Sequence, residues 1–479
     1  LNVRYTYIEL SKYLHALSAV GIVYFFLNES IENALIYILF CCIFYFLSYI
    51  VFYKINSIFI KLNFILLYVG YLLSMPILFY NKGDYEEYGW KGIGAYKFDH
   101  VQTFDALTVV TIYLVLFVII ALIVDMALLK SYKVRSFGKN INYFNDLSRF
   151  SKYSSIFLFL LILQFYLSYL MFQYKIGVVG VIPEDGLLFR IAGISYYYRY
   201  FIIPIIAFIL IFSNYWKSNF FLISLVLLEA FVSGVFGVSR AIVVLHSLPV
   251  VYFLALKNRR VTLSLVLLYI VAAISYVTIA REFVFSIEDF HNTDVASLFD
   301  FSLFNDIINL DYLSKILLMI VVRVQGYHEF FATFFSDIKY IDSNLFLHLS
   351  LGFTSLNYGD FNTTKDIFNV IVPNDKAFGM PLDNFSYLYL STKNIVLDTL
   401  VFFFLWTAFL ITTEKVLNFV FRRYKDNMLY LSFLNFYFIL GYFLPSVKAI
   451  FLLAPTLLLF FSVVINNIFL RRGFYSGYK

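Results

Sequence analysis

The sequence is dominated by stretches of about 20 mostly apolar residues, the length that a helix needs to cross the hydrocarbon core of a bilayer. The chain is 62% apolar and 14% charged, whereas a soluble domain is roughly half apolar and a quarter charged. The pattern therefore predicts an all-α polytopic membrane protein with about 12 transmembrane helices. The twelve expected spans are 8–27, 33–53, 60–80, 106–128, 155–173, 197–213, 219–238, 241–256, 262–280, 396–412, 428–445 and 449–469.

Basic residues predict which side of the membrane each connection occupies. The intervals 54–61, 129–154, 257–261 and 413–427 are basic, and all four fall on the same side of the twelve spans. With both termini in the cytoplasm, the inner segments hold 21 of the 36 Lys and Arg residues. We therefore expect cytoplasmic termini, and a first apolar stretch that is retained as a helix.

One connection, 281–395, is far longer than the others, and long loops are usually functional or disordered. Its composition is rich in Phe, Tyr, Leu and Ile, and its segment 314–335 is almost apolar enough to be another span. Counting it as a span would place the basic interval 413–427 outside, so we expect a helix lying on the outer membrane face. The predicted division is 1–280 with nine spans, 281–395 as a large periplasmic loop, and 396–479 with three spans and a cytoplasmic tail.

The sequence carries no signature of a soluble enzyme. It has no P-loop, no nucleotide-binding glycine-rich turn, no HExxH and no metal-spaced Cys or His cluster. The acidic residues Asp84, Glu86 and Glu87 of the first outer loop do not form a DxD pair. We therefore expect no metal, no cofactor and no nucleic-acid partner.

Arginines on the predicted outer side are the first candidates for chemistry, because guanidinium groups bind phosphate in a bidentate manner. They are Arg190, Arg199, Arg240, Arg281 and Arg323. The alternative is that they extend to lipid headgroups, and this is the preferred interpretation for Arg190 and Arg199. Arg323 lies in an apolar stretch, where a charge is costly and indicates function.

Arg240 would stand at the N-terminus of the eighth span, where the helix dipole favours an anion. Gly234 and Gly237 precede it and would allow a close approach of another chain segment. Further back, Glu229 lies in the middle of the seventh span. It could pair with His246 of the eighth span or couple a proton, and we prefer structural pairing.

A second set of candidates lies in the segment 314–335. On a helix, Gln325, His328 and Glu329 share one face, while Arg323 shares another face with Tyr327. A histidine near a glutamate could orient a sugar hydroxyl or take its proton. A hydrogen-bonded structural histidine is the alternative, and the sequence does not separate the two.

This organisation resembles the Wzy-type O-antigen polymerases of bacterial envelopes. The resemblance rests on the number of spans, the aromatic-rich composition, the late periplasmic loop and the arginines at its mouth. The strings GVSR at 237–240 and RVQG at 323–326 are similar to arginine-containing stretches of such enzymes. The spaced Arg-x10-Gly pattern of some members is absent, so we do not transfer precise roles from that pattern.

The resemblance implies a GT-C-like, metal-independent glycosyltransferase in the bacterial inner membrane, with its active site facing the periplasm. It would move a growing glycan from undecaprenyl diphosphate to another undecaprenyl-diphosphate-linked oligosaccharide, with membrane lipid around it and a chain-length regulator as partner. It assigns catalysis to His328, Glu329 and Arg323, diphosphate binding to Arg240, Arg281 and Arg323, and acceptor binding to Gln325 and Tyr327.

Three other functions remain open. A lipid-linked oligosaccharide flippase has a similar number of spans, although its loops are usually short and internal repeats are common in transporters. An O-antigen ligase shares the chemistry but uses lipid A-core as its acceptor. A sugar-modifying acyltransferase would need a catalytic histidine, for which His15 in the first span is a poor candidate.

Overall fold

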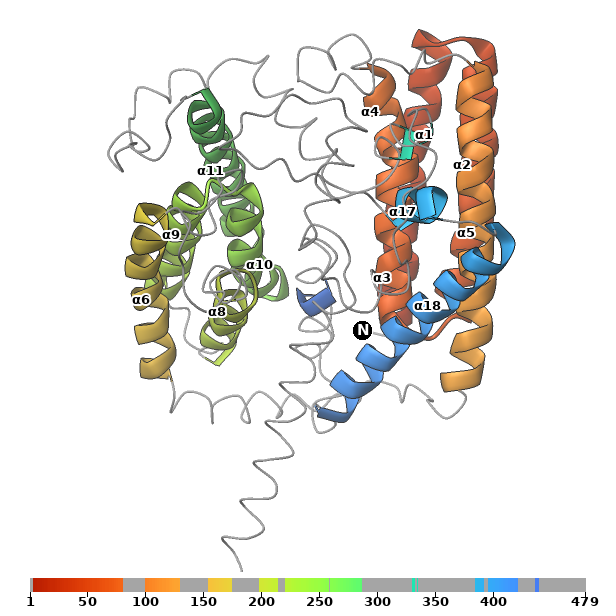
Figure 1. Ribbon diagram of the computed structural model, residues 1–479. Helices are drawn as coiled ribbons and strands as arrows, with labels where there is room; N and C mark the ends of the chain where they lie inside the picture. Colours follow the sequence, from red (N-terminus) through yellow and green to blue (C-terminus); the bar gives the residue numbers. More distant parts are fainter. Residues whose placement is uncertain are drawn as a thin grey trace, which may run out of the picture. The chain divides into compact units, whose positions relative to one another are not determined.

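The computed structural model describes residues 3–80, 100–129, 154–174, 198–213, 220–257, 259–286, 330–331, 334, 384–391, 395–420 and 436–438. All elements within these residues are helices (Figure 1). They belong to two compact units, which are described separately below.

The helices of unit 1 are α1 (Val3–Asn28), α2 (Ile31–Lys54), α3 (Ile58–Leu67), the π-helix η1 (Tyr68–Leu73), α4 (Ser74–Tyr80), α5 (His100–Leu129), α17 (Asn384–Ser391) and α18 (Ile395–Val420). The helices of unit 2 are α6 (Ser154–Gln173), the π-helix η5 (Tyr198–Ile202), α8 (Ile203–Ser213), α9 (Phe220–Phe236), α10 (Arg240–Leu256) and α11 (Arg260–Ser286).

Seven helical segments in the described part of the chain are long and apolar enough to cross a membrane. They are Leu10–Asn28, Ile31–Lys54, Ile58–Tyr80, His100–Leu128, Ser155–Gln173, Arg260–Arg281 and Leu397–Asn418. Three more apolar helices are shorter, namely Tyr198–Phe212, Phe220–Phe236 and Arg240–Ala255. The prediction of a helical membrane protein is confirmed at this level.

Ten of the twelve predicted spans coincide with described helices. Of the predicted span 428–445 only residues 436–438 are described, and the span 449–469 lies outside the described residues. The count of twelve, the GT-C-like arrangement and the three-part division of the chain therefore stay predictions.

Helix α11 runs through Arg281 to Ser286. The candidate membrane span within it ends at Arg281, the residue at which the long outer loop was predicted to begin. The sequence Phe283-Val284-Phe285 extends the apolar run, and neither glycine nor proline interrupts the helix before Ser286. Arg281 is consequently fixed on a helix rather than placed on a loop.

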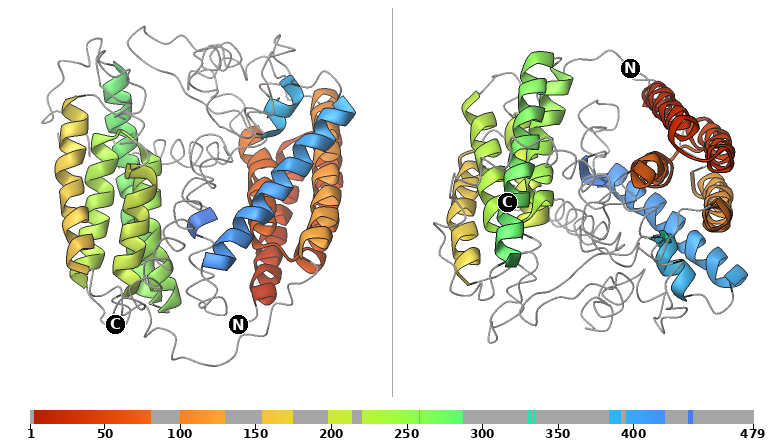
Figure 2. Two further views of the ribbon diagram at one scale, coloured as in Figure 1. Left: turned by 60° about the horizontal axis from the view of Figure 1, so that its bottom comes forward. Right: turned by 90° about the horizontal axis from the view of Figure 1, so that it is seen from above.

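The helices of unit 1 form a layer in which α1 contacts α2, α2 contacts α5, and α5 contacts α18 (Figure 2). Their outward faces carry large apolar side chains, such as Leu35, Phe46, Ile119 and Phe404, each about half exposed or more. Such a surface is unfavourable in water but matches lipid tails. The same helices are apolar on their inner faces, where Phe25 stacks on Tyr37 with 4.7 Å between ring centroids.

The third span contains the π-helix η1, which ends shortly before Pro76. Proline has no backbone N–H, so Pro76 cannot donate to the carbonyl of Leu72 four residues earlier. The hydroxyl of Tyr37 in α2 donates to this carbonyl instead, at 3.2 Å. Gly21 in α1 leaves room for the contact, because a Cβ there would overlap the Tyr37 hydroxyl and come within 2.8 Å of Pro76 Cγ.

Two carboxylates hold the turn between α2 and α3. Asp125 of α5 accepts hydrogen bonds from the backbone N–H groups of Asn56 and Ser57, both at 3.0 Å. Glu414 of α18 accepts from the Ser57 hydroxyl at 2.6 Å and from the Phe59 N–H at 3.1 Å. The first N–H groups of a helix have no partner within the helix, so Glu414 satisfies a donor that would otherwise be buried and unpaired.

Replacing Glu414 by alanine is expected to lower the free energy of unfolding of unit 1 by about 2 kcal/mol, because it leaves a buried N–H and a buried hydroxyl without an acceptor. Glu414→Gln keeps an oxygen acceptor and should cost less. Thermal unfolding of the purified protein in detergent measures both. An equal loss for the two variants would contradict the capping role.

Unit 2 is built around α9 and α10, which are joined by a tight turn (Figure 1). Helix α9 also contacts α6, and α10 also contacts α8 and α11. The polar side chains that are buried in the described part of this unit come from α6, η5, α9, α10 and α11, and from Ser239 in the α9–α10 turn.

Candidate functional site

The α9–α10 turn closes helix α9 with a specific backbone geometry. Ser239 N–H donates to the carbonyl of Gly234 at 2.9 Å, and Val238 N–H donates to the carbonyl of Val235 at 3.0 Å. This pair of bonds is the Schellman motif, in which the residue after the cap takes a left-handed conformation and is usually glycine. Here that residue is Val238, with φ of 49°. A β-branched residue in this conformation is strained, and strain of this kind is concentrated at functional sites.

At position 238 we therefore expect a glycine variant to be more stable than an alanine variant, the opposite of the usual order in a helix. Val238→Gly and Val238→Ala both remove the buried side chain, but only alanine retains the left-handed strain, which costs roughly 1 kcal/mol. We expect the glycine variant to unfold at the higher temperature, whereas in a helix interior alanine would be the more stable of the two. An alanine variant as stable as the glycine variant would show that the turn is unstrained.

Gly234 and Gly237 provide the close approach that the sequence predicts. A Cβ on Gly234 would overlap Val243 Cγ2 of α10 and come within 3.5 Å of Val277 Cγ2 of α11. A Cβ on Gly237 would come within 2.8 Å of Arg199 Nη1 of η5. The two glycines thus allow three neighbouring elements to meet at one turn.

Three arginines are brought to this turn from three elements. Arg199 of η5 lies against Gly237 and is 1% exposed. Arg240 is the first residue of α10 and is half-buried. Arg281 of α11 is half-buried and lies one helical turn beyond Val277, on the same face of the helix. Arg240 and Arg281 therefore stand at the same end of the α10–α11 hairpin.

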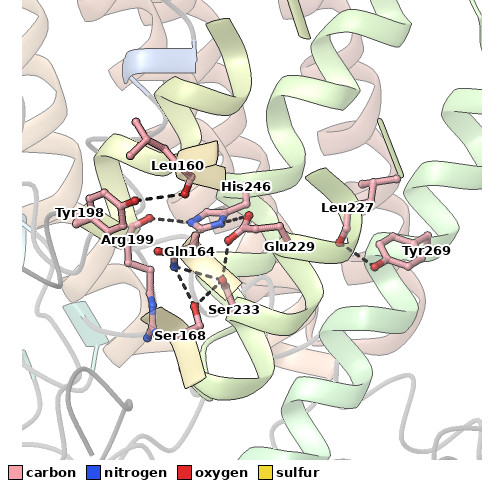
Figure 3. Close-up of polar contacts among 10 residues, drawn as sticks. All are labelled: Leu160, Gln164, Ser168, Tyr198, Arg199, Leu227, Glu229, Ser233, His246 and Tyr269. Carbon is pink, nitrogen blue, oxygen red and sulfur yellow. Dashed lines mark hydrogen bonds and ion pairs between the residues drawn. The ribbon is translucent and has the colours of Figure 1, made fainter. Parts of the chain in front are cut away.

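Beneath the turn, a buried network of polar side chains surrounds His246 of α10 (Figure 3). His246 Nδ1 lies 2.8 Å from Glu229 Oε2, and both side chains are 0% exposed. The predicted pairing of Glu229 with His246 is confirmed. The Ser233 hydroxyl donates to Glu229 Oε1 at 2.6 Å and lies 2.9 Å from the Ser168 hydroxyl, while the Gln164 amide donates to Ser168 at 2.9 Å.

The other ring nitrogen of His246 fixes its protonation. Nε2 lies 2.8 Å from the backbone carbonyl of Arg199. A carbonyl can only accept, so Nε2 carries a hydrogen. His246 is therefore held at both nitrogens by protein groups.

Among the residues predicted to carry function, the structure places Arg199 against Gly237, in the turn that leads to Arg240. It places Arg240 and Arg281 at the same end of the α10–α11 hairpin. The preferred interpretation of Arg199, a side chain extending to lipid headgroups, is wrong, because its guanidinium is buried in unit 2. Hydropathy at a span end could not reveal this; the nearby Gly237 was the available signal. The other predicted site residues lie outside the described residues and stay predictions: Arg190, Arg323, Gln325, Tyr327, His328 and Glu329.

His15, the candidate of the acyltransferase interpretation, lies in a separate polar cluster of unit 1. Its Nδ1 is 2.9 Å from the Tyr68 hydroxyl in η1, and its Nε2 is 3.2 Å from the Ser48 hydroxyl in α2. The Ser18 hydroxyl lies between those of Tyr45 and Tyr68, at 2.6 and 3.2 Å. Because both ring nitrogens bind side chains, the contacts are those of a structural histidine that joins α1, α2 and η1.

Comparisons of the chain with models of protein families, with curated proteins and with solved structures found no match.

Proposed function

We propose that the chain is a membrane glycosyltransferase of the O-antigen polymerase kind. It transfers a growing glycan from undecaprenyl diphosphate to the terminal sugar of another undecaprenyl-diphosphate-linked repeat unit. The observation that carries the proposal is the gathering of Arg199, Arg240 and Arg281 at the strained α9–α10 turn of an apolar helical unit. A lipid-linked diphosphate reaches such a turn from the bilayer and needs cations where its anionic headgroup emerges.

In the proposed reaction, the bond between the anomeric carbon and the diphosphate oxygen breaks, and the acceptor hydroxyl oxygen forms the new glycosidic bond. The negative charge that develops on the leaving diphosphate is stabilised by Arg240 and Arg281, which are half-buried. Arg199 is buried, so it acts from beneath by supporting the turn and adding positive potential. The bond to the diphosphate supplies the free energy, and the reaction consumes no nucleotide.

The acceptor side of the site is proposed from the sequence. Arg323 adds a third cation for the diphosphate, and His328 or Glu329 takes the proton of the acceptor hydroxyl. Gln325 and Tyr327 bind the acceptor sugar. We place the site on the periplasmic face of the bacterial inner membrane, with both termini in the cytoplasm and with a chain-length regulator as partner.

Deletion of the gene followed by gel analysis of the glycan tests this function. A polymerase mutant accumulates lipid A-core capped with a single repeat unit. Purified protein in vesicles should then extend undecaprenyl-diphosphate-linked repeat units without added nucleotide. In the deletion strain, by contrast, long chains that remain on undecaprenyl diphosphate would show that the missing protein is a ligase.

A second candidate function is a lipid-linked oligosaccharide flippase. The buried Glu229–His246 pair favours it, since ionisable groups within membrane spans often belong to proton-coupled transporters. The same deletion separates the two functions, because loss of a flippase removes all periplasmic repeat units, including the single-repeat product.

A further inference from the structure

Pro204 leaves a backbone acceptor without its helical donor at the start of α8. In a π-helix, the N–H of residue i+5 donates to the carbonyl of residue i. The π-helix η5 covers Tyr198–Ile202, so the donor expected for the Arg199 carbonyl is the N–H of residue 204. Proline has no N–H. The Arg199 carbonyl therefore needs a donor from another element, because an unpaired carbonyl inside a membrane protein is costly.

His246 is that donor. Its Nε2–H meets the Arg199 carbonyl at 2.8 Å, and the ring is held from the other side by Glu229 at 2.8 Å. Ser233 in turn fixes the second oxygen of Glu229. The imidazole is thus clamped between a carboxyl group of α9 and a main-chain carbonyl of η5 (Figure 3).

Unit 1 contains a related contact. There Leu72, near the end of the π-helix η1, lies four residues before Pro76, the spacing at which an α-helical N–H would donate to its carbonyl, and the Tyr37 hydroxyl donates to this carbonyl at 3.2 Å. In both units a side chain from a neighbouring helix replaces the backbone donor that a proline removes. The contact in unit 2 differs in one respect, because the residue whose carbonyl is bound carries a buried guanidinium.

Fixing the Arg199 backbone also fixes where its side chain can lie. Arg199 Nη1 lies against Gly237, and a Cβ on this glycine would come within 2.8 Å of Nη1. The next residue, Tyr200, places its hydroxyl 2.8 Å from the Ser239 hydroxyl, directly before Arg240. Two consecutive residues of η5 therefore support the turn from which Arg240 projects.

We propose that His246 is a positioning residue, whose Nε2–H replaces the backbone donor missing at Pro204 and so holds Arg199 beneath the arginine-bearing α9–α10 turn. Its role in glycan transfer rests on the proposed function, whereas its role as a replacement donor does not. His246 accepts no proton from the substrate in this scheme.

The first test is a double-mutant cycle on stability. The amide of asparagine reaches about as far from the backbone as Nδ1 of histidine, so His246→Asn keeps a donor for Glu229 and loses the donor to Arg199. We expect His246→Asn to lower the apparent Tm in detergent on the order of 5 °C. Pro204→Ala restores a backbone N–H, so His246→Asn should cost much less in the Pro204→Ala background. Equal losses in the two backgrounds would overturn the inference.

Pro76→Ala is the matched control, because it makes the same chemical change in unit 1. It should reduce the drop in apparent Tm that Tyr37→Phe causes, and it should leave the drop in apparent Tm that His246→Asn causes unchanged. Pro204→Ala should conversely leave the Tyr37→Phe loss unchanged. Rescue of His246→Asn by Pro76→Ala as well as by Pro204→Ala would mean general stabilisation and would contradict the specific pairing of His246 with Pro204.

The second test measures chain elongation by the same variants. The amide of glutamine reaches about as far as Nε2, so His246→Gln keeps a donor to Arg199 but cannot exchange a proton. We expect His246→Asn to slow chain elongation at least tenfold and His246→Gln to elongate at a rate close to wild type. Adding Pro204→Ala to His246→Asn should restore the elongation rate. Equal inactivity of both variants without rescue would make His246 an acid or base and refute the inference. If variants of Arg240 and Arg281 also leave elongation unchanged, the proposed function fails. The stability cycle then still decides whether His246 replaces the donor missing at Pro204.

Discussion

Arg240→Ala should abolish long-chain glycan while the protein remains folded and inserted in the membrane. In the proposed reaction the departing diphosphate gains negative charge next to this guanidinium, and removal of one such preorganised group typically slows a reaction by about 10²–10³-fold. Arg281→Ala should have a similar effect, since Arg281 stands at the same end of the α10–α11 hairpin. Gel analysis of the glycan from complemented deletion strains measures the loss as a shift to single-repeat product.

Arg260 provides the matched control for both substitutions. It begins α11 at the opposite end of the same hairpin and is exposed. Arg260→Ala should therefore leave chain length unchanged. Arg240→Lys retains the charge but loses the bidentate geometry, so an intermediate chain length is expected. Normal glycan from both Arg240→Ala and Arg281→Ala would remove the basis of the polymerase proposal.

Glu229→Ala should cause the largest loss of stability of any single substitution at the site. It removes the partner of His246 Nδ1 and the acceptor of the Ser233 hydroxyl, and both side chains are 0% exposed. Removing one member of a buried ionisable pair costs about 3–5 kcal/mol. The apparent unfolding temperature in detergent, together with the amount of folded protein in the membrane, measures this loss.

Two control variants show whether the stability lost in Glu229→Ala comes from its buried hydrogen bonds. Glu229→Gln keeps hydrogen-bonding atoms in place and should cost clearly less than the alanine variant. Glu32→Ala removes an exposed glutamate from the first turn of α2 and should change the apparent unfolding temperature far less. A Glu229→Ala protein as stable as Glu32→Ala would show that the buried network contributes little to folding.

Local sequence patterns were sufficient for the helical elements. The apolar stretches predicted ten spans that coincide with described helices, because the length of a span depends on the thickness of the bilayer and not on which helices are neighbours. Gly234 and Gly237 indicated a close approach, and Glu229 indicated a pairing with His246. Each of these predictions concerned residues on one helix or on two helices joined by a short turn.

Contacts between distant segments could not be predicted in the same way. The helices are apolar on most faces, so the sequence gives little indication of which face meets lipid and which meets protein. The sequence therefore predicted Arg199 to lie at the membrane surface, although its side chain is buried against Gly237. Glu414 caps a helix that begins 356 residues earlier, at Ile58.

The sequence by itself determined that this protein is a helical membrane protein and where ten of its helical spans lie. Only the tertiary structure decided that Arg199 is buried against Gly237 of the turn before Arg240, and that His246 contacts both Glu229 and the Arg199 carbonyl. The physical reason is that hydropathy acts along the chain, whereas a hydrogen bond between helices depends on their packing. In an apolar unit, that packing is set by a few glycines, prolines and buried polar groups.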